Sequence, residues 1–499
     1  MSALSADAQD TLETIRQRGT LIWGADQEGG GPFVFPRDDD PTQIQGFEVD
    51  FAEYLSAKLG VRAQFQQGQW DKLPDLLDRG DIDVVLNGYE WTPSRAARYG
   101  TSIPYYVYEL QLLARVDDAT LNSCDDLARP REPKWRVAVL GGSAADDYLA
   151  EHFPETVEIV RFDGATDAMR AVELAVDGID ANLQDLPVAV FYRDGFPRLK
   201  HAGPPVGSGD YVALVRNGDE PLLAAVNEAI ISGLRDGSLR RIFERYGLWN
   251  STQVHRGLET NAQDEYVPTG AGAVDAGDAP RPEPPAGYIA ERGWDVIRTR
   301  GPLLLKATAM TVLLSVTSMP LAVLCGLLLA LGRLFGPGWL RWPMTTYVEV
   351  IRGTPLVLQL YVIFFLLPEI GVSINAFWAA VIGLAINYSA YESEIYRAGI
   401  QAVPRGQMEA ALALGMSKWL ALRRVIVPQA TRLVIPPVTN DFIALFKDTA
   451  VCSVITVVEL SKEYYIQARS TGAILELGLL TCLLYLALSY PLSLLTGIL

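Results

Sequence analysis

The chain has 499 residues, and its charge is divided unevenly between two parts. Residues 1–290 carry 26 Lys and Arg against 47 Asp and Glu, whereas residues 291–499 carry 16 against 12. The acidic front part argues against binding of nucleic acid, which needs basic surface to meet phosphate. Four cysteines and three histidines form no cluster at metal-ligand spacing, so a structural zinc site is not expected. The pattern is typical of a water-soluble domain joined to a membrane domain.

The first residues, MSALSADAQD, show neither the basic nor the apolar segment of a secretory leader. If the front part is exported, we expect either a leader absent from this sequence or export that relies on the first membrane helix. The C-terminus stops within an apolar segment, and we expect the sequence to be trimmed at one or both ends.

Residues 19–255 alternate short apolar runs with amphipathic patterns. The runs GTLIWGAD, VRAQFQQ, IDVVLNG, WRVAVLGG and VEIVRF predict strands, while DFAEYLSAKLG and WDKLPDLLDRG predict helices. Strands that alternate with helices favour a mostly parallel α/β sheet. Two further strand-like runs, YELQLLARV and DYVALVRN, are expected to be paired crossings between two lobes, with the second lobe at about 117–208.

Residues 256–290 are rich in Gly, Ala, Pro and Asp and predict a flexible linker after a first domain at 1–255. Beyond it, long uncharged stretches predict an all-α membrane domain at 291–499, since one helical crossing of a bilayer needs roughly 20 apolar residues. Asp441 interrupts the fourth of the five candidate spans. These spans are 307–332, 353–368, 370–391, 433–446 and 473–499.

Basic residues concentrate after the first and third candidate spans, at Arg333 and Arg341 and then over about 397–432. Because Lys and Arg mark cytoplasmic loops, both segments are expected inside the cell. Five spans then place the N-terminal domain outside and the C-terminus in the cytoplasm.

The second basic segment contains EAALALGMSKWLALRRVIVPQA. It resembles the coupling loop of binding-protein-dependent ABC importer permeases, whose pattern is EAA, three residues, Gly, nine residues, Ile, one residue and Leu-Pro. The resemblance implies a helix, a tight turn at the glycine and a second helix, which together dock into a separate ATPase subunit. The pattern falls on Glu409, Ala410, Ala411, Gly415 and Pro428, with Val425 and Val427 replacing the family's Ile and Leu.

The segments IRGTPLVLQLYVIFF, YESEIYRAGI and FIALFKDTAVCSVI are similar to the polar-amino-acid branch of these permeases, and the resemblance covers essentially all of 291–499. Polar groups within apolar spans are costly and often mark a transport route, although they also pair within helix bundles. The candidates for a translocation path are Asn387, Glu392, Asn440, Asp441 and Glu476.

The front part, over about 15–250, resembles the periplasmic amino-acid-binding proteins of the same importers. The matching stretches include GFEVDFAEYLSAKLG, WDKLPDLLDRGDIDVVLNGYEWTPSRAARYGTSIPYY and DGIDANLQDLPVAVFY. The resemblance implies a clamp that closes on a free amino acid. The expected fold is therefore a two-lobed α/β periplasmic-binding-protein fold followed by an all-α transmembrane permease domain of five helices.

A receptor for an amino acid needs a guanidinium group for the ligand carboxylate and an anion for its ammonium group. By the resemblance, Arg95 in TPSRAARY takes the first role and Asp185 in NLQDLPVAV the second. The alternatives are a surface ion pair for Arg95 and a helix cap for Asp185.

Four further positions match contacts of the family. Asp26 corresponds to a first-lobe acid of glutamine-type members, and Trp70 to an aromatic side chain that stacks on the ligand, unless it is plain core. Gly88 and Ser143 fit backbone and hydroxyl contacts to the ligand.

Glu90 departs from the family pattern, because Ser or Thr is usual five residues before the arginine. A carboxylate here adds negative charge to the pocket, so it favours a cationic ligand side chain, changes how the ammonium group is held, or pairs with a nearby arginine. Ala144 is a second departure, at a position where Gly often follows the hydroxyl residue. Both leave the identity of the amino acid open.

The resemblance implies an importer in a bacterial inner membrane that captures a polar or charged amino acid outside the cell. The chain contains no G-x-x-x-x-G-K-[ST] motif, so ATP and Mg²⁺ are expected on a separate ATPase partner, and no cofactor is expected in this chain. We also expect a homodimer of this chain in the lipid bilayer. The alternative is a membrane-anchored amino-acid receptor without transport, and no nucleophile–base set indicates an enzyme.

Overall fold

The computed structural model describes residues 11–162, 164–255, 258 and 293–498, so most of the predicted linker lies outside the described residues. The N-terminal α/β part and the C-terminal helical part are two compact units.

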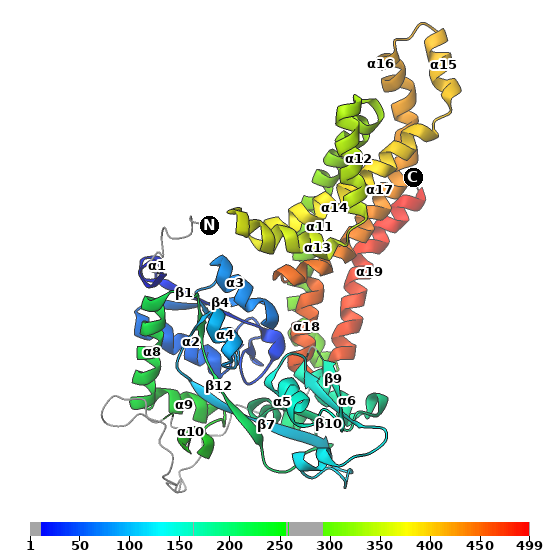
Figure 1. Cartoon of the computed structure of the whole chain (residues 1–499). Helices are drawn as coiled ribbons and strands as arrows, with labels where there is room; N and C mark the ends of the chain where they lie inside the picture. Colours follow the sequence, from blue (N-terminus) through cyan, green and yellow to red (C-terminus); the bar gives the residue numbers. More distant parts are fainter. Residues whose placement is uncertain (1–10, 163, 256–257, 259–292, 499) are drawn as a thin grey trace. The chain divides into compact units, whose positions relative to one another are not determined.

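The first sheet of the N-terminal unit has the order β4-β1-β5-β13-β6. Figure 1 labels its strands β1 and β4. The strand β1 pairs in parallel with β4 and β5, whereas β13 runs antiparallel to β5 and β6. The strands are β1 (Thr20–Ala25), β4 (Arg62–Gln67), β5 (Val84–Val85), β6 (Gly100–Thr101) and β13 (Leu214–Val215). A small antiparallel ribbon, β2 (Phe35–Pro36) with β3 (Ile44–Gln45), lies outside this sheet.

The second sheet has the order β11-β7-β10-β8-β9, with β12 on the other edge of β7. The strands β8, β9 and β10 are parallel, and β7 pairs antiparallel with β10, β11 and β12. The strands are β7 (Tyr106–Arg115), β8 (Trp135–Leu140), β9 (Val157–Phe162), β10 (Ala181–Asp185), β11 (Leu199–His201) and β12 (Val206–Tyr211). Two separate sheets confirm the predicted two-lobed α/β architecture.

Two chain segments connect the lobes, one between β6 and β7 and one between β12 and β13. They hydrogen-bond to each other, because the Tyr105 amide donates to the Tyr211 carbonyl over 3.0 Å and the Ser102 amide donates to the Ala213 carbonyl over 2.9 Å. The second crossing lies within the predicted run DYVALVRN. The first lies at 102–105, before the predicted run YELQLLARV, which is almost entirely part of β7.

Ten helices in the described residues cover the sheets of this unit. Their apolar residues form the core, as in α2, where Phe47, Phe51 and Leu55 are completely buried. The helices are α1 (Thr11–Arg18), α2 (Phe47–Leu59), α3 (Leu73–Arg79), α4 (Pro93–Arg98), α5 (Ala144–His152), α6 (Ala165–Glu173), α7 (Leu186–Tyr192), α8 (Glu220–Arg235), α9 (Ser238–Arg245) and α10 (Ser251–His255).

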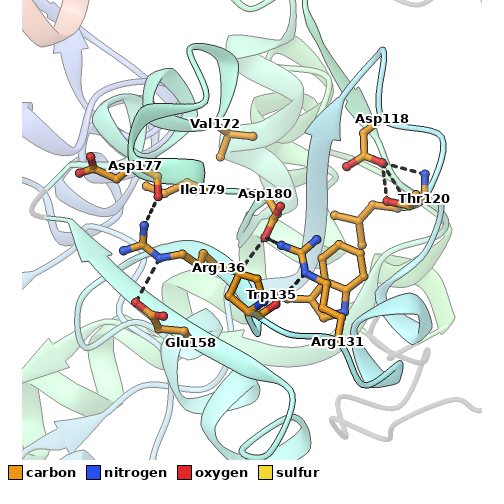
Figure 2. Close-up of polar contacts among 12 residues, drawn as sticks. Asp118, Thr120, Arg131, Trp135, Arg136, Glu158, Val172, Asp177, Ile179 and Asp180 are labelled. Carbon is orange, nitrogen blue, oxygen red and sulfur yellow. Dashed lines mark hydrogen bonds and ion pairs between the residues drawn. The ribbon is translucent and has the colours of Figure 1, made fainter.

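A polar cluster fixes the ends of strands in the second lobe (Figure 2). The Asp180 carboxylate accepts hydrogen bonds from Arg131 over 2.6 Å and from the Arg136 amide over 2.9 Å, while Arg136 also pairs with Glu158 over 3.1 Å. The Arg131 guanidinium lies 3.9 Å from the centre of the Trp135 ring. Each charge in this cluster has a partner, so we assign it to the stability of the lobe.

The C-terminal unit is helical. Its elements are α11 (Trp294–Phe335), α12 (Gly338–Arg352), α13 (Leu356–Tyr361), α14 (Ala376–Ala402), α15 (Arg405–Ala413), α16 (Lys418–Ala421), α17 (Val427–Asp448), α18 (Leu460–Thr471) and α19 (Ile474–Ile498). The helices α11 and α14 approach closely at Gly326, where a Cβ atom would lie 2.5 Å from Cβ of Glu392.

Two helices in the described residues, α11 and α19, are long and apolar enough to cross a membrane. A third span results if α12 and the helical segment Leu356–Ile370, which meet at 109°, count as one. The prediction of five spans is therefore not confirmed. The predicted third span, 370–391, also begins too early, since α14 begins at Ala376. Asn387 and Glu392 are both buried on this helix.

Candidate functional site

The Asp26 carboxylate organises the loops that follow the strands of the first lobe. It accepts hydrogen bonds from Gln67 Nε2 over 2.7 Å, from the Trp70 amide over 3.1 Å and from the Glu28 amide over 3.0 Å. The Asp26 amide in turn donates to Asn87 Oδ1 over 2.6 Å. Because these partners all lie in the first lobe, the contacts fix the loop that carries Trp70. A ligand contact by Asp26 stays a prediction.

Gly88 has a φ angle of +63°, and a Cβ atom there would lie 2.7 Å from the Phe33 ring. Only glycine fits this conformation and this space. The Gly88 amide donates over 2.8 Å to Oε1 of Glu48, which also accepts a hydrogen bond from the Tyr105 hydroxyl. Burial raises the pKa of Glu48 to about 7.

Two aromatic rings form a platform in the first lobe. Trp70 stacks on Tyr89 with ring centroids 4.9 Å apart and an interplanar angle of 22°. The Tyr89 hydroxyl donates to the Trp70 carbonyl, and the Trp70 indole N–H donates to the Asn87 carbonyl over 3.0 Å. Trp70 is half-buried, so one part of its ring is available to a ligand.

Arg95 lies over this platform. The short helix α4 carries it, and the Thr92 hydroxyl caps that helix by accepting from the Arg95 amide over 3.2 Å. The guanidinium carbon is 5.4 Å from the centre of the Trp70 ring and 5.2 Å from that of the Tyr89 ring, which is cation–π distance. The Arg95 side chain remains 22% exposed.

The Glu90 carboxylate contacts both lobes. Its Oε2 accepts from Nη1 of Arg95 over 2.6 Å, and its Oε1 accepts from the backbone amide of Ala144 over 3.3 Å. Ala144 is the first residue of α5 in the second lobe, and Glu90 itself is 4% exposed. Of the three roles expected for Glu90, the structure shows the pairing with a nearby arginine.

The second lobe contributes Ser143 and Asp185. Ser143 precedes α5, is buried, and its hydroxyl has no hydrogen-bond partner in the described part of the chain. Asp185 ends β10 and accepts a hydrogen bond from the Tyr211 hydroxyl. Burial, and after it the Glu90 carboxylate, raises the pKa of Asp185 to about 7. Asp185 makes no ion pair with any described residue, and its contact with a ligand stays a prediction.

The lobes also touch through apolar and backbone groups beside the site. The Gly31 amide donates to the Tyr192 hydroxyl over 3.0 Å, and the rings of Phe35 and Phe191 are 5.0 Å apart. Tyr192 and Phe191 belong to the second lobe and the other two residues to the first. The described conformation is therefore a closed clamp.

The structure brings Trp70, Glu90 and Arg95 into direct contact, and it joins Glu90 to the second lobe beside Ser143. It adds four residues to the predicted site, because each of them directly holds a predicted site residue. These residues are Gln67, Asn87, Tyr89 and Tyr211. Asn87 and Tyr89 are adjacent in the sequence to the predicted residues Gly88 and Glu90, but no sequence signal identifies Gln67 and Tyr211.

The predicted coupling loop forms two helices joined by a turn. The helix α15 ends at Ala413, and Gly415 follows with a φ angle of +83° while its amide donates to the Leu412 carbonyl over 2.9 Å. Ser417 caps α16 by accepting from the Leu420 amide over 3.2 Å. Glu409 and Ala410 are exposed, Ala411 is buried, and Pro428 lies in the first turn of α17.

This loop exposes large apolar side chains. Leu414 is 84% exposed and Trp419 is 70% exposed. Its base is anchored by a small core in which Val403, Ile426 and Ala430 are buried. A rigid base with an apolar outer face is suited to contact with another protein.

The candidates for a translocation path occupy different environments. Asn387 is buried on α14 and donates to Gln359 Oε1 over 3.1 Å, and Glu392 is completely buried one turn further along. Asp441 is half-buried on α17, which packs against α14, whereas Asn440 is exposed. Glu476 lies in the first turn of α19 and accepts from the Gly293 amide over 3.2 Å. Of these five residues, only Asn387 and Glu392 are buried, and both belong to α14.

The fold and the site define a solute-binding clamp joined to a helical membrane unit. Residues 21–248 match the bacterial extracellular solute-binding proteins, family 3. Residues 322–499 match the binding-protein-dependent transport system inner membrane component.

Several individual proteins are similar to parts of this chain. The L-cystine transport system permease protein TcyB of Bacillus subtilis (strain 168) is 41% identical over 203 residues, which are 40% of this chain and 87% of that protein. The arginine transport system permease protein ArtQ of the same organism is 37% identical over 188 residues, covering 38% and 86%. The crystal structure of an amino acid ABC transporter with histidines is 37% identical with a TM-score of 0.40, covering 42% of this chain and 97% of that one.

The chain belongs to the inner-membrane permeases of binding-protein-dependent amino-acid ABC transporters, and it carries a family 3 solute-binding domain in the same polypeptide. It is an importer permease with its own substrate-binding domain. This membership favours transport over the alternative of a receptor without transport.

Proposed function

We propose that the cleft between the two lobes captures a cationic amino acid. The observation that carries this proposal is the charge around the cleft, where Asp185 has no basic partner among the described residues and Glu90 already neutralises Arg95. An ammonium or guanidinium group of the ligand restores the balance, because a buried charge needs a partner. A relative named for arginine transport is consistent with this ligand class.

We assign roles to the individual residues from their charge and from the hydrogen-bonding groups that they leave available to a ligand. Asp185 binds the α-ammonium group, and the half-buried ring of Trp70 stacks on the ligand side chain. Gly88 offers the ligand a backbone carbonyl and Ser143 an unpartnered hydroxyl. Arg95 fixes the position of the Glu90 carboxylate by hydrogen bonding to it. Asp26 supports the site through the loop of Trp70.

Isothermal titration of the full chain in lipid nanodiscs against the twenty amino acids tests the ligand class. We expect arginine and lysine to bind more tightly than glutamine, and glutamate not to bind. Asp185→Asn should weaken arginine binding at least tenfold, whereas Asp194→Asn, at an exposed position of the same lobe, should not. Tightest binding of glutamate would overturn the proposal.

We further propose that the helical unit works as a homodimer with separate ATPase subunits, which bind ATP and Mg²⁺. The exposed apolar side chains of the coupling loop support a protein contact there. The basic residues of that loop support a cytoplasmic position, with the solute-binding domain outside and α11, α12–α13, α14, α17 and α19 as five spans. Asn387, Glu392 and Asp441 are then the best candidates for the route, since Asn440 is exposed and Glu476 lies at a helix end.

Reconstitution of the full chain with its ATPase in liposomes tests this arrangement. We expect arginine supplied on the side of the solute-binding domain to stimulate ATP hydrolysis and to accumulate on the other side. ATP hydrolysis that stays the same at saturating arginine would contradict it.

A further inference from the structure

Glu90 bonds to the two groups that would otherwise attract the carboxylate of a ligand. One is the guanidinium of Arg95, 2.6 Å from Oε2, and the other is the backbone amide of Ala144, 3.3 Å from Oε1. The same Arg95 nitrogen also donates to the Glu90 carbonyl over 2.7 Å. Both anion-binding groups of the cleft are thus engaged by one side chain of the protein.

The position of the second group explains its affinity for an anion. Ala144 begins the nine-residue helix α5, and the first amides of a helix are unpaired donors at the positive end of the helix dipole. The buried, unpartnered hydroxyl of Ser143 lies beside this amide and is a third donor. Arg95, the α5 terminus and Ser143 therefore form an anion cradle that spans the two lobes, and Glu90 occupies it.

An incoming carboxylate would have to displace Glu90 or enter beside it. Displacement leaves Glu90 as a buried charge without its partner, which is strongly unfavourable. Entry beside it places a further anion near Glu90 and Asp185, with Arg95 already paired. A carboxylate on the ligand is therefore opposed at this site, whereas a cation next to Asp185 is favoured.

We propose that Glu90 supplies from within the protein the carboxylate that an α-amino acid would otherwise bring, so that the cleft takes amines without an α-carboxylate at least as well as the corresponding amino acids. The ligand class is a small organic cation with an ammonium group for Asp185 and a second cationic or aliphatic part. This inference rests on the proposed function, because it uses the same cleft as the ligand site.

Matched pairs of amino acid and decarboxylated amine test the role of Glu90. Isothermal titration of the full chain in nanodiscs compares arginine with agmatine and lysine with cadaverine. We expect each amine to bind within threefold of its amino acid or more tightly. In Glu90→Ser, which frees the cradle, we expect the amino acid to bind at least tenfold more tightly than the amine.

A second variant guards against a folding defect. Glu90→Gln keeps the size of the side chain and removes its charge, and it should shift the amine-to-amino-acid ratio in the same direction as Glu90→Ser. Glu53→Gln, at an exposed position of α2, is the control and should leave the ratio unchanged.

The results separate this inference from the proposed function. Arginine binding that is more than tenfold tighter than agmatine binding in the unaltered protein, with the same ratio in both Glu90 variants, overturns the inference and leaves the proposed function intact. Absence of binding by both members of each pair overturns both.

Discussion

Glu48 couples the folding of the first lobe to pH. Its carboxyl is completely buried, and burial raises its pKa from 4.5 to about 7. Between these values the folded state binds more protons than the unfolded state, so the free energy of unfolding falls as the pH rises. The contribution of protonated Glu48 to the free energy of unfolding is complete below pH 4.5 and is lost as the pH rises through 7.

We expect Glu48→Gln to remove this dependence. The first lobe of the unaltered protein should lose up to about 3 kcal/mol of stability between pH 5 and pH 8, while the variant should lose much less. Hydrogen exchange of the peptides around Gly88 in the full chain, corrected for the intrinsic rate at each pH, measures the difference. Equal slopes for the variant and the unaltered protein would show that Glu48 does not titrate in this range.

If Asp185 binds the ammonium group of the ligand as proposed, ligand affinity should rise with pH, whereas the stability contribution of Glu48 falls. A cation binds to the ionised carboxylate, and burial together with Glu90 raises the pKa of Asp185 to about 7. We therefore expect arginine affinity to rise about tenfold from pH 6 to pH 8, as the carboxylate ionises. Titrations at a series of pH values measure this, and Asp185→Asn should bind weakly at every pH. An affinity of the unaltered protein that does not change with pH would refute the role of Asp185.

At the scale of elements, the turn between α15 and α16 is the part of the coupling loop with the strictest backbone requirement. Gly415 has a φ angle of +83°, so Gly415→Ala should strain the turn by about 1 kcal/mol without any steric contact at Cβ. We expect several-fold loss of arginine-stimulated ATP hydrolysis with unchanged arginine affinity. Gly406→Ala, in α15 with open space around it, is the matched control and should hydrolyse ATP normally. Equal activities in the two variants would argue against the turn as a coupling element.

The contact between α11 and α14 depends on the absence of a side chain at Gly326. An added Cβ would lie 2.5 Å from Cβ of Glu392 and 2.9 Å from the Ser389 carbonyl oxygen. Gly326→Ala should separate the helices and destabilise the helical unit by about 1–3 kcal/mol, seen as a lower Tm in detergent. Gly338→Ala, where nothing lies within 4 Å, should leave the Tm unchanged. An unchanged Tm in Gly326→Ala would show that the helices separate freely.

The sequence predicts helices and strands well where a segment is a single continuous apolar run. The predicted runs 135–142 and 157–162 correspond to β8 and β9, and the first candidate span lies within α11. It misplaces the start of the third candidate span at 370, because residues 371–375 are as uncharged as residues 376–391 that follow, whereas α14 begins only at Ala376. It also fails for the partner of Glu90, since the Ala144 amide is 54 positions away and only the closed fold brings it near.

At the scale of the whole molecule, fusion of the binding domain to the permease sets the number of binding domains. Each permease subunit carries one domain, so a homodimer carries two, whereas a heterodimer with another permease carries one from this chain. The proposed homodimer therefore predicts that two copies of this chain can be recovered together. Two differently tagged copies, expressed in the same cells, should purify as one complex through either tag.

Mixed complexes then show whether the two domains act independently. A complex of one unaltered chain and one Asp185→Asn chain keeps a single functional cleft, while both coupling loops remain intact. If either domain can deliver ligand to the shared permease, arginine should still stimulate ATP hydrolysis, at about half the rate of the unaltered homodimer when delivery is limiting. Complete loss would mean that both domains must be loaded. Failure to recover any mixed complex would contradict the homodimer, because a chain that pairs only with a different permease never meets its own copy.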